Sequence, residues 1–157
     1  MDPFPVTVIY RHKKENLKKC SLRGLEPRSD LAFYTYPKDT IPPLSSYILL
    51  TLDAPPLTQE DANYGIFLID GTWKHAETMY NQLSKPHLFI TRSLPSHLKT
   101  AYPRRQEDCV DPERGLASVE ALFAAYYILG RKTEGLLDFY YWKEAFLQKN
   151  PFFSNLR

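Results

Sequence analysis

Five short runs of hydrophobic residues occupy the first two-thirds of the chain, separated by polar connecting segments. The runs cover residues 6–10, 31–36, 47–52, 65–70 and 87–91. Several are continuously apolar rather than alternating, as is typical of strands that are covered on both faces of a parallel sheet. The pattern therefore predicts an α/β fold with a mostly parallel sheet of about five strands.

Helical patterns lie between and after these runs. Residues 73–83 carry hydrophobic side chains at helical spacing, and Thr58 has the position of an N-cap for a shorter helix. Residues 118–129 predict a buried helix that ends at Gly130, a residue type common just after a helix. Residues 133–149 are amphipathic and aromatic, and they predict a second C-terminal helix.

The order of these patterns divides the chain into two lobes. We expect an α/β lobe over residues 1–92 and a helical lobe over residues 93–157, which share one core and one ligand cleft. A chain of 157 residues, of which 43% are hydrophobic, is long enough to form one compact unit of this kind.

The basic residues are concentrated in two segments. The formal net charge is only +2, so a general nucleic-acid coat is not indicated. Residues 11–28 nevertheless hold seven Lys and Arg side chains against two Glu, and residues 92–105 hold four and no acid. Two basic segments beside one cleft favour a positively charged groove.

Cysteine content and the hydrophobic runs exclude several other classes. Cys20 and Cys109 form no CxxC pair, so we expect reduced thiols rather than a zinc site or a disulfide. The four histidines are scattered, so no metal site is expected, and surface or cap roles are their default interpretation. No apolar run reaches membrane-spanning length and no secretory signal is evident, so we expect a cytoplasmic protein without a membrane partner.

The residues that carry chemistry follow the predicted strands. The sequence Asp70-Gly71-Thr72-Trp73 lies directly between the fourth run and the helical pattern after it. In open parallel sheets ligands bind at the carboxyl ends of the strands. The chain has no glycine-rich phosphate loop, so ATP or a dinucleotide bound through its phosphates is not indicated.

Three motifs occur in a characteristic order: Asp70-Gly71-Thr72-Trp73, then Arg92-Ser93-Leu94-Pro95, then Leu116-Ala117-Ser118-Val119-Glu120-Ala121. In this order they resemble the DTW-domain superfamily of RNA aminocarboxypropyltransferases. Residues 19–25 and 137–150 are similar to stretches of its rRNA branch, whereas Gly71-Thr72 and residues 102–106 are closer to its tRNA branch. The Asn-Pro-x-Asn-Tyr-Gly stretch of the rRNA branch is missing, so the motifs support the reaction more strongly than the RNA target.

This resemblance implies a SPOUT-like, knotted α/β lobe followed by the helical lobe. It also implies transfer of the 3-amino-3-carboxypropyl group of S-adenosyl-L-methionine to N3 of a uridine or pseudouridine in rRNA or tRNA. Two alternatives remain open. One is an RNA methyltransferase that uses the same cofactor in a knotted fold, and the other is a non-catalytic RNA-binding or ribosome-assembly module.

The resemblance also implies a cofactor site. Trp73 and Ala76 match an apolar pocket that buries the cofactor's methyl group, so that a different sulfonium carbon faces the RNA. An aromatic ring also stabilises a nearby sulfonium cation. Ser21 matches a hydroxyl that contacts the methionine part. The implied cofactor-binding residues are Ser21, Leu52, Asp70, Trp73, Ala76, Leu94, Leu116, Ser118 and Ala121.

Catalysis and RNA contact are predicted on other grounds. Asp70 is the candidate general base for the weakly acidic N3 proton. Its alternative role, a turn or cap residue, remains open because a sulfonium is already an activated leaving group. Glu120 lies just inside a helix start and is expected to be structural. The candidate phosphate contacts, for which a solvated charged face is the alternative, are Arg23, Arg92, Arg104 and Arg105.

Overall fold

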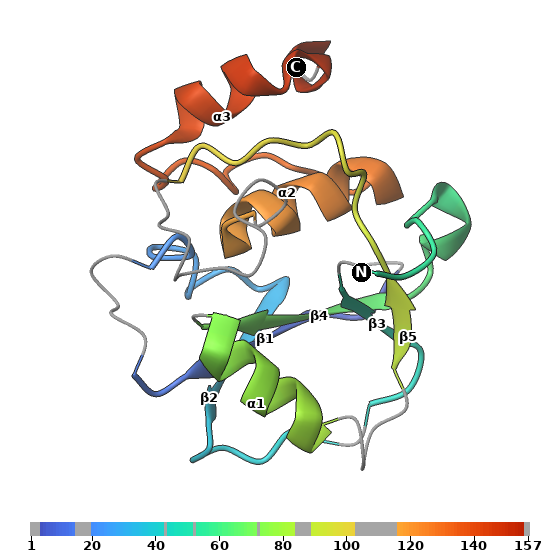
Figure 1. Ribbon diagram of the computed structural model, residues 1–157, viewed down its shortest axis with the longest axis vertical. Helices are drawn as coiled ribbons and strands as arrows, with labels where there is room; N and C mark the ends of the chain where they lie inside the picture. The colour runs from blue at the N-terminus through green and yellow to red at the C-terminus, as the bar shows by residue number, and fades with distance from the viewer. Residues whose placement is uncertain are drawn as a thin grey trace.

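The computed structural model confirms the predicted parallel sheet. It describes residues 4–14, 20–42, 44–51, 53–71, 73–83, 89–102 and 116–155, with the backbone alone at residues 73, 74, 154 and 155. The strands are β1 (Thr7–His12), β2 (Leu31–Tyr36), β3 (Tyr47–Leu50), β4 (Gly65–Asp70) and β5 (Ile90–Arg92). They form one sheet in the order β2-β1-β4-β3-β5, and every pairing is parallel (Figure 1).

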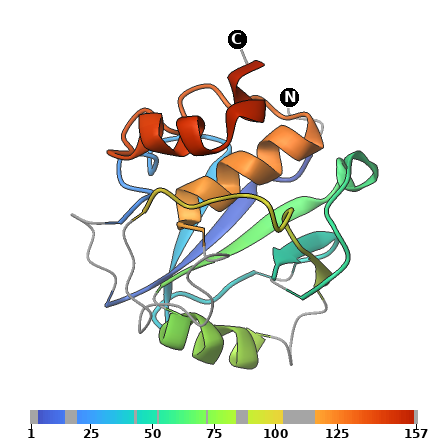
Figure 2. The ribbon, with the colours of Figure 1, turned by 45° about the horizontal axis from the view of Figure 1, so that its top comes forward.

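The central strands β1 and β4 are buried on both faces because helices lie on both sides of the sheet (Figures 1 and 2). On one side, Met79 of α1 (Trp73–Leu83) packs with Val8 and Phe67. On the other side, α2 (Ser118–Leu129) packs against alternate residues of the same strands, including Ile9. This double covering explains why these runs are continuously apolar in the sequence.

The C-terminal residues form a further layer over α2 (Figure 2). This layer contains α3 (Lys143–Lys149) and the 3₁₀ helix η3 (Pro151–Asn155). Phe146 and Phe153 contact Phe123 of α2 edge-on, at ring-centroid distances of 6.1 Å and 5.0 Å. The main hydrophobic cluster thus combines side chains from the sheet, α2 and this layer.

The predicted second helix is shorter than expected. Residues 133–142 form successive turns, and only residues 143–149 of the expected 133–149 are helical. Gly135 has φ +81°, a left-handed conformation that interrupts a helix. The turns are closed by backbone bonds between residues three apart, such as Asp138 N to Gly135 O at 3.3 Å.

The two predicted caps are confirmed. Thr58 caps the 3₁₀ helix η1 (Gln59–Asp61), and its hydroxyl accepts a hydrogen bond from the Glu60 backbone nitrogen. Gly130 follows α2 with φ +75°, as expected for a C-cap glycine. None of the helices in the described ranges is long and apolar enough to span a bilayer.

Candidate functional site

The motif Asp70-Gly71-Thr72-Trp73 lies at the predicted corner between a strand and a helix. Strand β4 ends at Asp70 and helix α1 begins at Trp73. Asp70 is in register with Arg11 at the carboxyl end of β1, the neighbouring central strand. The corner therefore lies at the sheet edge where parallel α/β folds bind ligands.

Asp70 is the centre of a buried hydrogen-bond network. Its side chain receives hydrogen bonds from three segments that are far apart in the sequence. Ser118 Oγ donates to Oδ1 at 2.8 Å, and Arg11 Nε and Cys20 Sγ donate to Oδ2 at 3.1 Å and 3.2 Å. Asp70 is only 3% exposed. The carboxylate therefore joins β4 to β1, to the loop that follows β1 and to the start of α2.

Two side chains that donate hydrogen bonds to Asp70, those of Cys20 and Arg11, have raised pKa values and stay protonated. Burial and then the charge of Asp70 raise the pKa of the Cys20 thiol to about 12, so this cysteine is a hydrogen-bond donor rather than a nucleophile. Burial lowers the pKa of Arg11, but Cys20 and Asp70 outweigh that effect and the net shift is upward. Arg11 also pairs with Glu26 at 3.2 Å. Cys20 is a free thiol, and Cys109 lies outside the described residues.

The start of α2 is held by the same loop. The preceding residue, Ala117, has no side-chain group that can cap a helix. Ser21 replaces that group, because its hydroxyl accepts a hydrogen bond from the Val119 backbone nitrogen at 3.1 Å. Together with the bond from Ser118 to Asp70, this places Ser21, Asp70 and Ser118 around one helix N-terminus. The structure thus brings together three of the predicted cofactor-binding residues.

Glu120 is structural, as expected from the sequence. Its role is not limited to an interaction with the helix dipole, because it also binds other segments of the chain. Its buried carboxylate accepts four hydrogen bonds. Thr100 Oγ1 and the Ala117 nitrogen donate to Oε1 at 2.6 Å and 2.8 Å. The Ala101 nitrogen and the Tyr140 hydroxyl donate to Oε2 at 2.8 Å and 2.9 Å. Glu120 therefore fixes two other chain segments to the first turn of α2.

Of the remaining predicted cofactor-binding residues, the structure describes the side chains of some but not of all. Leu94, Leu116 and Ala121 pack at the margin of the hydrophobic cluster beneath α2. Ala76 is half-buried in the first turn of α1. Trp73 begins α1, but its side chain lies outside the described part of the chain, as does all of Leu52.

The predicted RNA-contacting arginines are not equivalent. Arg23 lies on the surface in the turn after Cys20. Arg92 is instead paired with Asp61 at 3.2 Å and also donates to the Thr91 carbonyl, which ties β5 to η1. Arg104 and Arg105 lie outside the described residues.

A histidine pair beside the corner was missed by sequence reasoning. The rings of His12 and His75 stack at 3.8 Å with 8° between their planes. His12 is 8% exposed, so the expected surface role is wrong for this residue. Its Nδ1 accepts a hydrogen bond from the Lys14 nitrogen at 3.0 Å. The polar end of an otherwise apolar strand was the only sequence signal for its position.

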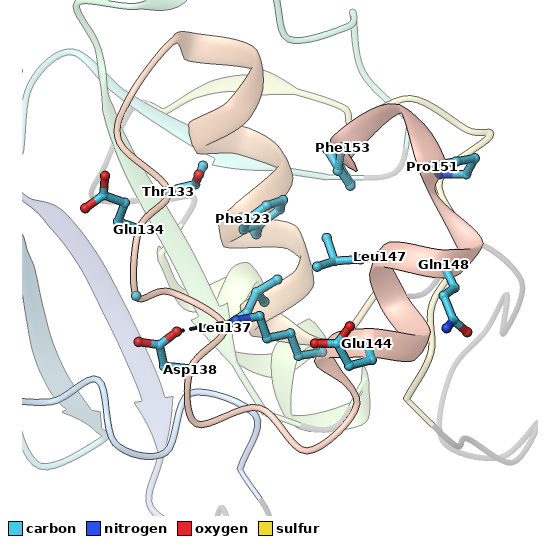
Figure 3. A pocket seen from close by; sticks show the side chains of 12 residues that line it. Phe123, Thr133, Glu134, Leu137, Asp138, Glu144, Leu147, Gln148, Pro151 and Phe153 are labelled. Atoms are coloured by element: carbon cyan, nitrogen blue, oxygen red, sulfur yellow. Dashed lines mark ion pairs between the residues drawn. The ribbon is translucent and has the colours of Figure 1, made fainter. Parts of the chain in front are cut away.

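Figure 3 shows a separate pocket between α2 and α3, with a volume of about 530 Å³. Phe123, Leu147 and Phe153 form its apolar wall, while the rim carries the ion pair of Lys143 with Asp138 at 3.6 Å. None of the predicted cofactor-binding residues lines this pocket. Among the described residues no cluster of His, Cys, Asp or Glu could hold a metal ion.

A parallel α/β sheet with a polar network at its strand ends is typical of enzymes that bind a nucleotide-like cofactor. Comparisons with known proteins are consistent with this class. The chain is 28% identical over 156 residues to the 16S rRNA aminocarboxypropyltransferase of Methanocaldococcus jannaschii, covering 96% of this chain and 85% of that protein.

The fold is similar to that of the SAM-dependent rRNA:acp-transferase Tsr3 from Vulcanisaeta distributa. The TM-score is 0.71 at 28% sequence identity, covering 96% of this chain and 80% of that chain. No family model matches the chain, so the DTW-domain assignment stays a prediction. The activity predicted from the motifs is the activity that both names state, and both relatives act on rRNA.

Proposed function

We propose that this chain is an rRNA aminocarboxypropyltransferase that uses S-adenosyl-L-methionine and modifies N3 of a uridine or pseudouridine. The observation that carries the proposal is the position of the Asp70 network. It joins the carboxyl ends of β1 and β4 to the N-terminus of α2, in a fold similar to that of a SAM-dependent rRNA transferase over 96% of this chain.

The residues at this edge fit the proposed cofactor. The N-terminus of α2 carries partial positive charge, and the Ser21 hydroxyl, which accepts from the Val119 nitrogen, can donate its proton to a carboxylate. Ser118 already donates its proton to Asp70, so it orients the network rather than the cofactor. Leu94, Leu116 and Ala121 offer apolar contacts for an adenine ring. S-adenosylmethionine would supply an electrophilic sulfonium carbon, so the protein need not activate a leaving group. Trp73 and Ala76 would then decide which sulfonium carbon is presented to the RNA.

For Asp70 we propose a positioning role. A general base must have a lone pair available near the proton that it accepts. The Asp70 carboxylate already accepts hydrogen bonds from Arg11, Cys20 and Ser118 and is almost completely buried. The prediction that Asp70 is the base is therefore kept as the alternative. The knotted, SPOUT-like path of the chain, the division into two lobes and a cytoplasmic location are further parts of the proposal.

The proposal is tested by following the label from two cofactor preparations. One carries the isotope in the aminocarboxypropyl chain and the other in the methyl group. Each is incubated with the purified protein and rRNA that lacks the modification, with tRNA as the parallel substrate. We expect only the chain label in a modified rRNA nucleoside. Methyl label would identify a methyltransferase, and RNA binding without either label would identify a non-catalytic module.

A further inference from the structure

Residues 94–102 follow β5 without forming a helix or strand, yet the end of this stretch is firmly held. Leu98 is buried in the main hydrophobic cluster. The buried Asn150 side chain accepts from the Lys99 nitrogen at 3.0 Å and donates to the Lys99 carbonyl at 2.9 Å. The irregular coil that leads from β5 past α2 (Figure 1) is therefore fixed to the C-terminal layer.

Glu120 of α2 holds the next residues of this coil. Thr100 Oγ1 donates to Glu120 Oε1 at 2.6 Å, and the Ala101 nitrogen donates to Oε2 at 2.8 Å. The same Thr100 hydroxyl accepts a hydrogen bond from the Tyr102 nitrogen at 3.0 Å. One hydroxyl thus connects the completely buried carboxylate to the backbone of Tyr102. The position of residues 100–102 depends on this connection, because no helix or strand orders their backbone.

The carboxylate also places this coil beside the start of α2. The Ala101 and Ala117 nitrogens donate to its two oxygens, each at 2.8 Å, so the two backbones lie next to each other. Ala101 and Tyr102 are half-buried and pack against the margin of the main cluster. Three of the predicted cofactor-binding residues are half-buried against the same cluster: Leu94, Leu116 and Ala121.

We propose that Ala101 and Tyr102 form a further wall of the adenine part of the cofactor site, and that Thr100 positions this wall through Glu120. The inference rests on the proposed function, since the occupant is the S-adenosylmethionine of that proposal. A site for a flat apolar ring needs apolar side chains that are held in place and only partly covered. Thr100 itself is a positioning residue, because its hydroxyl is used by Glu120 and by the Tyr102 nitrogen.

The network offers a matched pair of variants. The hydroxyls of Thr100 and Tyr140 both donate to Glu120, at 2.6 Å and 2.9 Å, but they come from different segments. Thr100→Ala and Tyr140→Phe each remove one hydrogen bond from the same carboxylate, so both should lower the melting temperature. Only Thr100→Ala also releases the backbone of Tyr102.

The wall is tested by measuring the affinity of the purified protein for two ligands well below its melting temperature. One is S-adenosylmethionine, and the other is 5′-methylthioadenosine, which has the adenine ring but no methionine carboxylate. We expect Thr100→Ala to weaken both by about 3- to 10-fold, the change that corresponds to one hydrogen bond. Thr100→Ser should restore both affinities, and Tyr140→Phe should keep them at wild-type values.

A direct variant keeps the test decisive if Thr100→Ala does not fold. Tyr102→Ala should weaken both ligands at least as much, whereas Tyr102→Phe keeps the ring and should bind like the wild type. Wild-type affinity in folded Thr100→Ala or in Tyr102→Ala overturns the wall.

Two further outcomes also overturn it. Equal losses in Thr100→Ala and Tyr140→Phe would assign the effect to the α2 N-terminus in general. A loss for S-adenosylmethionine alone would place the contact at the methionine end. In each of these cases a wild type that binds and transfers leaves the proposed function standing. If the wild type binds neither ligand, the proposed function fails and the wall fails with it.

Discussion

The hydroxyl of Ser21 caps helix α2 by accepting a hydrogen bond from the backbone nitrogen of Val119, 98 residues later in the chain. The residue that precedes the helix, Ala117, has no group of its own for this purpose. Because the cap comes from the loop after β1, any movement of that loop changes the support of the helix N-terminus. The loop and the helix therefore act as one unit at the candidate site.

Ser21→Ala should destabilise the protein modestly. Loss of a helix cap costs about 1 kcal/mol, which corresponds to a decrease of roughly 2–4 °C in melting temperature for a protein of this size. Ser21→Thr keeps the hydroxyl and serves as the control. Calorimetry with S-adenosylmethionine tests the second predicted role, and a loss of affinity in folded Ser21→Ala is expected if the hydroxyl also contacts the cofactor.

Asp70→Asn should lower the melting temperature while leaving transfer by the folded protein within about tenfold of the wild type. Asparagine removes the charge that pairs with the buried Arg11, but Arg11 keeps its pair with Glu26, so the cost should be below the about 3–5 kcal/mol of a buried charge left unpaired. Single-turnover rates at two pH values, beside a melting curve, give both quantities. A rate lowered by about 10²–10⁴-fold that partly recovers at high pH would show that Asp70 is the general base.

Trp73→Ala should weaken S-adenosylmethionine binding by at least about tenfold, because an aromatic wall and a cation–π contact are worth about 1–2 kcal/mol. Trp73→Phe retains a ring and should lose less. Calorimetry on the folded variants measures the difference. Unchanged affinity in Trp73→Ala would assign this side chain to packing alone.

The arginines should separate into two groups. Reversing the charge of Arg104 and Arg105 should weaken RNA binding and reduce the slope of affinity against salt by about one unit for each phosphate that is no longer neutralised. Arg92→Gln should instead lower the melting temperature, because Arg92 is paired with Asp61. RNA titrations at several salt concentrations make the comparison. Equal slopes for wild type and the double charge reversal would contradict the RNA role.

His12 should make stability depend on pH. Burial, followed by the charges of His75, Lys14 and Lys13, lowers the pKa of His12 below 6.5. The unfolded chain then binds more protons than the folded one, so stability is complete above the unfolded pKa and is lost as the pH falls through it. Melting temperatures at about pH 7.5 and about pH 5.5 should differ less in His12→Gln than in the wild type. His97→Gln, at an exposed residue whose ring contacts Phe152 at 5.2 Å, is the control for losing a histidine elsewhere in the protein.

The sheet could be predicted because the sequence signals for its strands come from adjacent residues. Continuous apolar runs, the Thr58 cap and the Gly130 cap each depend on a few adjacent residues, and all were confirmed. The helix predicted over residues 133–149 was wrong over residues 133–142, where the left-handed conformation of Gly135 interrupts it. A helical period alone cannot distinguish a helix from consecutive turns that bury similar side chains.

The sequence predicted which residues belong to the candidate site, but not the hydrogen bonds between them. Motif order identified Ser21, Asp70 and Ser118, yet nothing local indicates that Ser118 donates to Asp70, 48 residues away. The pairing of Arg92 with Asp61 and the stacking of His12 on His75 likewise join separate elements. These relationships depend on strand order, which the hydrophobic pattern does not specify.

The strand order has a consequence for synthesis on the ribosome. Among the described residues, strand β3 pairs with β4 and β5, and both are translated after it. The inner edge of strand β1 pairs with β4, which is also translated later. Until β4 has emerged from the ribosome, the inner edges of both strands are unpaired, and such edges are templates for aggregation. At ordinary elongation rates this interval lasts on the order of seconds, which makes the half-synthesised chain a substrate for chaperones.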